Sequence, residues 1–167
     1  MQSPNTQDLN TPGLNTRGLN TRGQNMESAA GLAPLTDGFS QAYWDAARDG
    51  TLLIQRCGDC GGYQFYPRGH CTACFAPDPE WVPASGLGRV HTYTVIHRTP
   101  NAEFAADCPY VLAIVDLDEG PRMTARIIGE AGGLCCDARV RVVFAPATDD
   151  EAGSDTGCVL PNFVLAA

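Results

Sequence analysis

Four of the eight cysteines form two C-x-x-C pairs that are separated by ten residues, Cys57-Gly-Asp-Cys60 and Cys71-Thr-Ala-Cys74. Each pair places two thiolates on one side of a tight turn, and two such turns that face each other supply the tetrahedral set of sulfurs that zinc prefers. Gly61, directly after the first pair, permits the positive φ that turns backbone amides toward the sulfurs. The spacing therefore predicts one structural zinc ion bound by all four cysteines.

Other chemistry for these pairs is less favoured. Iron is the main metallic competitor for four thiolates. A thioredoxin-like redox site needs one C-x-x-C in a βαβ context, which this sequence lacks. A catalytic zinc needs an open coordination position, and four cysteines close the coordination sphere. The second pair is followed by Phe75, which is less suited than glycine to a positive φ.

The remaining reactive side chains do not form a recognisable catalytic set. A nucleophilic Cys108 would need a base nearby, and His97 is the histidine best placed in the sequence to supply one. An independent hydrolase or aldolase that uses His97 is therefore the enzymatic alternative, and we expect no enzyme acting alone. The other cysteines outside the pairs are interpreted, with Cys108, as small buried side chains: Cys135, Cys136 and Cys158.

One helix is expected before the cysteine pairs, in residues 39–50, FSQAYWDAARDG. Ser40 suits the N-cap and Gly50 the C′ position. Its apolar residues recur at helical spacing, which is typical of packing on a core, and docking to a partner protein is the alternative. The candidate interface residues are Phe39, Tyr43 and Trp44.

Strand patterns dominate the rest of the chain. Residues 51–56 and 63–67 are expected to flank the first cysteine pair as strands, and five more candidates follow: RVHTYTVIHR (89–98), YVLAIVDL (110–117), PRMTARIIG (121–129), RVRVVFA (139–145) and CVLPNFVL (158–165). Asp118-Glu119-Gly120 predicts a hairpin turn. No long helix separates these strands, which favours a mostly β protein with a five-stranded antiparallel barrel of the OB type. A small sandwich remains possible on this pattern.

The chain has 167 residues and a net charge of −8, from 19 acidic residues and 11 arginines without a lysine. An acidic chain repels a phosphate backbone, so a single-stranded nucleic-acid-binding module is only the alternative function. The paired cysteines and the absence of a signal-peptide pattern indicate the cytoplasm, and no apolar run is long enough to cross a membrane.

Three regions are expected. Residues 1–35 form an extension that contains the repeat LNTPG, LNTRG, LNTRG and is predicted to be disordered. Residues 36–84 form the helix and zinc ribbon, and residues 85–167 form the OB-fold domain.

Several stretches together resemble the DUF35 family, OB-fold proteins with an N-terminal rubredoxin-like zinc ribbon. The similar stretches are YWDAARDGTLLIQRCGDCG (43–61), TYTVIHRTP (92–100), CPYVLAIVDLDEGPRM (108–123), ARIIG (125–129) and RVRVVF (139–144). The resemblance covers about residues 39–165. The chain departs from it at the repeat, at Cys135-Cys136 and in the acidic stretch 149–157.

This resemblance implies a non-catalytic subunit of an acyl-CoA enzyme. Proteins of the family accompany thiolase-fold enzymes, which include thiolases, ketosynthase-like acyltransferases and aldolases of steroid side-chain degradation, and so serve lipid metabolism. A CoA thioester is then a possible shared ligand, for which arginines beside a narrow apolar slot are needed. The candidate ligand-binding residues are His97, Arg98, Arg122 and Arg126.

Overall fold

The structure, a computed structural model, describes residues 38–100, 102–129, 132–146 and 159–166. The extension predicted to be disordered, residues 1–35, lies outside the described residues. In chain order the elements are α1 (Gln41–Arg48), β1 (Leu53–Arg56), β2 (Tyr63–Gln64), β3 (Glu80–Pro83), β4 (Leu87–Ile96), the 3₁₀ helix η1 (Ala102–Asp107), β5 (Tyr110–Leu117), β6 (Arg122–Ile127), β7 (Arg139–Pro146) and β8 (Val159–Leu165). No helix among these is long and apolar enough to span a bilayer.

The predicted helix is confirmed as α1, and its two ends differ in how they are capped. Ser40 occupies the N-cap position, but its side chain makes no capping hydrogen bond. At the other end Gly50 has a φ of +76°. The Thr51 N–H donates to the Ala46 carbonyl (2.8 Å) and the Gly50 N–H to the Ala47 carbonyl (3.1 Å). These two bonds form a Schellman motif, which glycine at C′ allows without steric cost.

A small three-stranded sheet follows the helix, in the order β2-β1-β3 with both pairings antiparallel. Strand β1 confirms the strand expected in residues 51–56, whereas β2 has only two of the five residues expected in 63–67. Strand β3 was not predicted. Strands of two to four residues bury little apolar surface, so this sheet needs further support.

The five later strands close into a barrel in the order β4-β5-β6-β8-β7, which confirms the OB-type fold and excludes the sandwich. The expectation of a wholly antiparallel barrel is wrong at one pairing, because β6 and β8 run parallel. A closed ring with an odd number of strands cannot alternate direction throughout. The parallel pair is therefore a consequence of closing five strands, and β7 lies between β6 and β8 in the sequence to provide the crossover.

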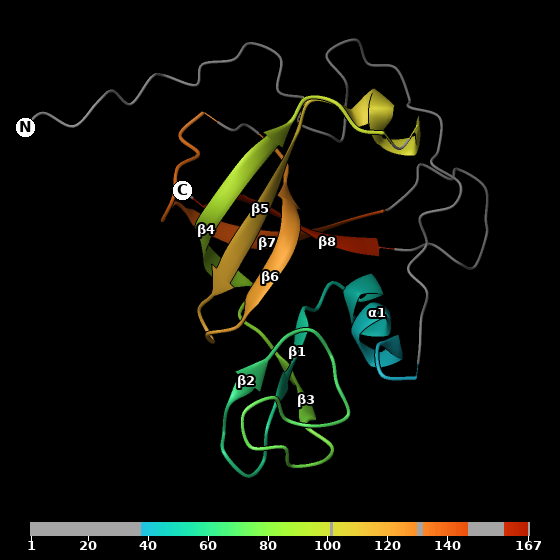
Figure 1. The fold of residues 1–167 in the computed structure, drawn as a ribbon, viewed down its shortest axis with the longest axis vertical. Coiled ribbons are helices and arrows are strands. Elements are labelled where there is room, and N and C mark those ends of the chain that lie inside the picture. Colours follow the sequence, from blue (N-terminus) through green and yellow to red (C-terminus); the bar gives the residue numbers. More distant parts are fainter. Residues whose placement is uncertain (1–37, 101, 130–131, 147–158, 167) are drawn as a thin grey trace, which may run out of the picture.

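One hydrophobic core joins the helix, the small sheet and the barrel. Figure 1 shows α1 and strands β1 to β3 together below the barrel. Within the barrel, Val90, Val115, Val140 and Phe163 are fully buried. Helix α1 contacts both β1 and β8, and its buried Tyr43 belongs to the same apolar cluster as the barrel interior. The small sheet is therefore held against the barrel by shared apolar contacts, not by the covalent linker alone.

The predicted turn at Asp118-Glu119-Gly120 is confirmed, and it also fastens the linker between β3 and β4. The Ser85 N–H donates to Glu119 Oε1 (2.6 Å), and the Asp118 N–H donates to the Leu87 carbonyl (3.0 Å). Arg139 donates two hydrogen bonds to the Asp118 carboxylate, and these hold the pKa of Asp118 below its usual range. Hydrogen bonds thus connect the turn between β5 and β6 to β4, to β7 and to the linker that arrives from the small sheet.

Replacing Gly88 by alanine should destabilise the barrel, because a Cβ there would lie 2.5 Å from the Asp116 carbonyl oxygen and 2.8 Å from Val115 Cγ1. The backbone of β5 would have to move, and we expect the free energy of unfolding in urea to fall by about 2–3 kcal/mol. Gly132→Ala is the matched control, because its Cβ would meet nothing within 4 Å. Equal stability of the two variants would contradict the close packing of β4 on β5.

Candidate metal centre

The structure brings the four predicted cysteines together at the tip of the small sheet. Their sulfur atoms all lie within 4.8 Å of one another. The Sγ atoms of Cys57 and Cys74 are 3.5 Å apart, and those of Cys60 and Cys71 are 3.6 Å apart. A tetrahedral zinc with bonds of about 2.3 Å sets its sulfurs about 3.8 Å apart, so the four thiols are positioned to bind one metal ion. Four soft sulfur donors suit zinc or iron.

The two cysteine turns share one backbone pattern. In the first, the Gly61 N–H donates to the Cys57 carbonyl (3.0 Å), and in the second the Phe75 N–H donates to the Cys71 carbonyl (3.1 Å). Gly61 and Phe75 have φ values of +70° and +63°. Phe75 therefore takes the same left-handed conformation as the glycine, at the steric cost that a Cβ brings there, and its side chain is exposed.

A pair of buried glutamines positions the second cysteine turn. Gln64 Nε2 donates to Gln55 Oε1 (2.8 Å) and to the His70 carbonyl (3.2 Å). Gln55 Nε2 donates to the Arg68 carbonyl (3.0 Å). In return, the Arg68 N–H donates to Gln55 Oε1 and the Thr72 N–H to Gln64 Oε1, each at 2.8 Å. Two side chains thus hold the backbone on both sides of His70, just before the third cysteine.

Sequence reasoning missed this glutamine pair. Gln55 and Gln64 are directly opposite each other in the β1–β2 register, and their exposed fractions are 4% and 6%. The available signal was a glutamine inside the apolar strand 51–56, since a buried amide must find partners. The partners themselves lie in a loop and depend on how that loop folds.

The four predicted ligand-binding residues do not gather at one place. His97 and Arg98 are exposed directly after β4 ends. Arg122 lies opposite Asp116, which in turn lies opposite Arg89 near the start of β4. Arg122 is therefore at the other end of the barrel strands from His97 and Arg98. It also forms an ion pair with Asp116, whose pKa is lowered by hydrogen bonds from Arg122 and His91, although burial acts against this shift.

Arg126 is already engaged within the chain. Its Nη1 donates to Asp107 Oδ2 (2.7 Å), and Asp107 is buried. The guanidinium carbon also lies 4.2 Å from the ring centroid of Tyr110 and 5.0 Å from that of Phe104. These contacts hold η1 against β6, so binding a phosphate there would compete with a buried carboxylate.

The three predicted interface residues have different environments. Tyr43 is 4% exposed, and burial raises the pKa of its hydroxyl, with a smaller effect from Tyr66. Trp44 is half-buried against the core. Phe39 is 59% exposed, so it is the one of the three that offers most of its side chain to a partner.

The cysteines outside the metal centre differ from the expectation that they are buried. Cys135 and Cys136 are exposed, so the prediction is wrong for this pair, because they lie in a turn before β7 and not on a strand. Cys108 is half-buried, with its thiol 3.6 Å from the Phe104 carbonyl oxygen. Cys158 lies outside the described residues.

Comparison with known proteins agrees with this architecture. The family model for the rubredoxin-like zinc ribbon domain of ChsH2 matches residues 44–80, and the model for the C-terminal OB-fold domain of ChsH2 matches residues 81–145. In the solved structure described as the Ltp2-ChsH2(DUF35) aldolase, a chain with 31% identity superimposes with a TM-score of 0.68, over 80% of this chain and 99% of that one. This chain belongs to the DUF35 family.

The curated relatives of this DUF35 chain include subunits of enzymes and scaffold proteins. A probable enoyl-CoA hydratase alpha subunit of Thermomonospora curvata is 38% identical, over 54% of this chain and 28% of the relative. A DUF35 domain-containing scaffold protein of Methanocaldococcus jannaschii is 40% identical, over 46% of this chain and 55% of the relative. The benzoylsuccinyl-CoA thiolase subunit BbsA of Geobacter metallireducens is 33% identical, over 54% of this chain and 60% of the relative. The matches thus span between 28% and 60% of these relatives.

Replacing Gln64 by leucine should weaken metal binding by the DUF35 chain. The change keeps the side-chain volume but leaves the Thr72 N–H, the His70 carbonyl and Gln55 Oε1 without this partner. Unsatisfied buried groups cost about 1–3 kcal/mol each, so we expect the metal dissociation constant to rise at least about tenfold in a chelator competition.

The matched control for this variant is Gln41→Leu, because Gln41 is exposed on the helix surface, where its side chain donates a 2.8 Å hydrogen bond to Asp45. It should bind metal like the unchanged chain. Equal metal affinity of the Gln64 and Gln41 variants would show that the glutamine pair does not position the cysteines.

Proposed function

We propose that this DUF35 chain is a non-catalytic subunit that binds a thiolase-fold enzyme and supports its folding or its substrate binding. The observation that carries the proposal is the alignment with 99% of the chain from the Ltp2-ChsH2(DUF35) aldolase, at 31% identity. The likeness to a subunit of benzoylsuccinyl-CoA thiolase and to DUF35 scaffold proteins gives further support. The partner is a thiolase, a ketosynthase-like acyltransferase or a steroid side-chain aldolase, and the two chains form a hetero-oligomer in the cytoplasm.

The ion of the metal centre is Zn²⁺ in this proposal, with Cys57, Cys60, Cys71 and Cys74 as its ligands. Four thiolates close the coordination sphere, so the ion supplies folding free energy and no open site for a substrate. The match to a zinc ribbon family model over residues 44–80 supports zinc over iron. Metal analysis of the purified chain distinguishes the two.

A non-catalytic role agrees with the surroundings of the candidate reactive groups. Among the residues that the structure describes, His97 is exposed and no carboxylate or thiol is hydrogen-bonded to it, so nothing there orients it as a base. Cys108 directs its thiol to the Phe104 carbonyl oxygen. Within the described part of the chain, neither residue has the partner that would activate it.

Acyl-CoA is a shared ligand in this proposal, held mainly by the partner enzyme. Arg122 and Arg126 are each paired with an aspartate, which reduces their attraction for phosphate. Arg98 and His97, exposed at the end of β4, are the better placed of the four candidates to contact CoA at an interface. The same pairing of arginines disfavours the alternative, a single-stranded nucleic-acid-binding module, because such a module needs an unbalanced basic groove.

Co-expression of the full chain with a thiolase-fold protein encoded beside it should give a stable hetero-oligomer. We expect co-elution in size-exclusion chromatography with light scattering, and higher thiolase or aldolase activity than that of the partner alone. The purified DUF35 chain should have no activity of its own on acyl-CoA substrates. Failure to associate with any such protein, together with salt-dependent binding of single-stranded DNA, would favour the nucleic-acid alternative.

A further inference from the structure

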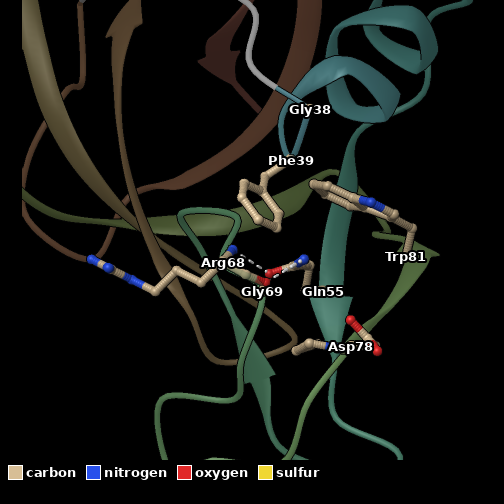
Figure 2. A pocket seen from close by; sticks show the side chains of 8 residues that line it. Gly38, Phe39, Gln55, Arg68, Gly69, Asp78 and Trp81 are labelled. Carbon is tan, nitrogen blue, oxygen red and sulfur yellow. Dashed lines mark hydrogen bonds between the residues drawn. The ribbon is translucent and has the colours of Figure 1, made fainter.

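A pocket of about 160 Å³ lies between the start of α1 and the small sheet (Figure 2). An engineered protein cavity of about 150 Å³ holds a benzene molecule, so this pocket has room for one flat group of about six heavy atoms. Its lining comes from three parts of the chain: Gly38 and Phe39; Gln55; and Arg68, Gly69, Asp78, Pro79 and Trp81.

The side chains around this pocket are of the kinds that bind a flat cation. Figure 2 shows the rings of Phe39 and Trp81 on one side and the carboxylate of Asp78 on the other. Phe39 is 59% exposed and Trp81 half-buried. The Arg68 side chain extends away from the rings and from Asp78, and the Gln55 amide, which donates to the Arg68 carbonyl, lies between them. Aromatic faces and a carboxylate attract cations, and a guanidinium group also stacks flat on a ring.

Asp78 is held in place and available to a ligand. Its N–H donates to the Gly69 carbonyl (2.9 Å), and His70 and Pro77 form a β-bridge beside it. Its φ is +50°, a conformation that aspartate tolerates better than most residues. Within the part of the chain that the structure describes, no cation is paired with the Asp78 carboxylate, whereas the carboxylates of Asp107, Asp116 and Asp118 all have an arginine.

The charge around the pocket also favours a positive occupant. The chain has a net charge of −8. Four thiolates around one bound Zn²⁺ would add a net charge of −2 at the metal centre, and Cys71 of that centre is two residues from Gly69 of the pocket lining. This field attracts a cation, and the positive charge of Arg68 opposes it less because the Arg68 side chain extends away from the pocket.

We propose that this pocket binds an arginine side chain of the partner enzyme. The proposal rests on the proposed function, because it assumes a protein partner. The guanidinium lies between the rings of Phe39 and Trp81 and forms an ion pair with Asp78. Binding one anchoring arginine in a desolvated pocket is a common way in which a small interface gains affinity.

The first test uses the full zinc-loaded chain and N-acetylarginine methylamide as the probe, with the matching citrulline compound as a neutral analogue of similar shape. The chain has two tryptophans, Trp44 and Trp81, so the NMR signals of their indole N–H groups separate the pocket from the core. We expect the arginine probe to shift the Trp81 signal saturably and leave Trp44 unchanged. Equal shifts with the citrulline compound, or none at Trp81, would overturn the proposal.

The variant for this titration is Asp78→Asn, and the matched control is Glu80→Gln, an exposed acid two residues away that does not line the pocket. We expect Asp78→Asn to weaken probe binding about tenfold and Glu80→Gln to leave it nearly unchanged. Equal effects of the two variants would show that general charge, and not this pocket, attracts the probe. Probe binding only after Arg17→Gln and Arg22→Gln would show that the chain's own extension is the occupant, which also overturns the proposal.

The second test measures the affinity of the same two variants for the co-expressed thiolase-fold protein. We expect Asp78→Asn to raise the dissociation constant of the complex about tenfold with full zinc content, and Glu80→Gln to have little effect. A complex that forms equally with both variants overturns the inference and leaves the proposed function standing. If the unchanged chain binds no partner, the proposed function fails, and with it the partner arginine, whatever the probe titration shows about cation binding.

Discussion

The close approach of four cysteine sulfurs is the constraint on which the ribbon depends. Deprotonated thiols within 4.8 Å of one another repel, and only a cation between them makes the arrangement favourable. The strands that lead to these cysteines have two to four residues and cannot resist that repulsion by burial alone. The barrel is stabilised mainly by burial, since its strands are longer and its interior contains four of the six largest fully buried side chains: Phe163, Val90, Val115 and Val140. One chain therefore combines a metal-dependent part with a part stabilised by apolar burial.

The metal centre and the pocket beside α1 are built on the same short loop. Gln55 belongs to the buried glutamine pair and also lines the pocket, and its amide holds the backbone of Arg68. Gly69 contributes to the pocket lining, and Cys71 is a metal ligand two residues later. Addition of a Cβ at Gly69 would place it 3.0 Å from the ring of Phe39, so the helix start fits closely on this loop. The candidate metal ligand Cys71 and the pocket residue Gly69 are thus separated by one residue, so loss of the metal should also disturb the pocket that is proposed to bind a partner.

The sequence predicted those features whose signal is local. The spacing of the cysteines identified all four sulfurs that come together, and the apolar, valine- and isoleucine-containing run in residues 110–117 identified β5 with its correct bounds. Features that depend on the assembled chain were not predictable. The periodicity of residues 39–50 marked Phe39 and Tyr43 alike, but only the fold shows that Tyr43 is covered by the core while Phe39 is 59% exposed. The partners of Gln64 are backbone groups of a loop, and the parallel β6–β8 pair follows from closure of the ring. The relative positions of Arg122 and His97 likewise depend on the strand register.

The most direct test of this account is amide hydrogen exchange of the full chain before and after removal of the metal with a chelator. We expect amide protection to be lost across residues 57–76, where both cysteine turns and the glutamine-bound loop lie, and strands β4, β5 and β6 to keep most of theirs. Unchanged protection in residues 57–76 would contradict the claim that the metal organises the ribbon. Loss of protection throughout β4, β5 and β6 would contradict the claim that the barrel is stable on its own burial.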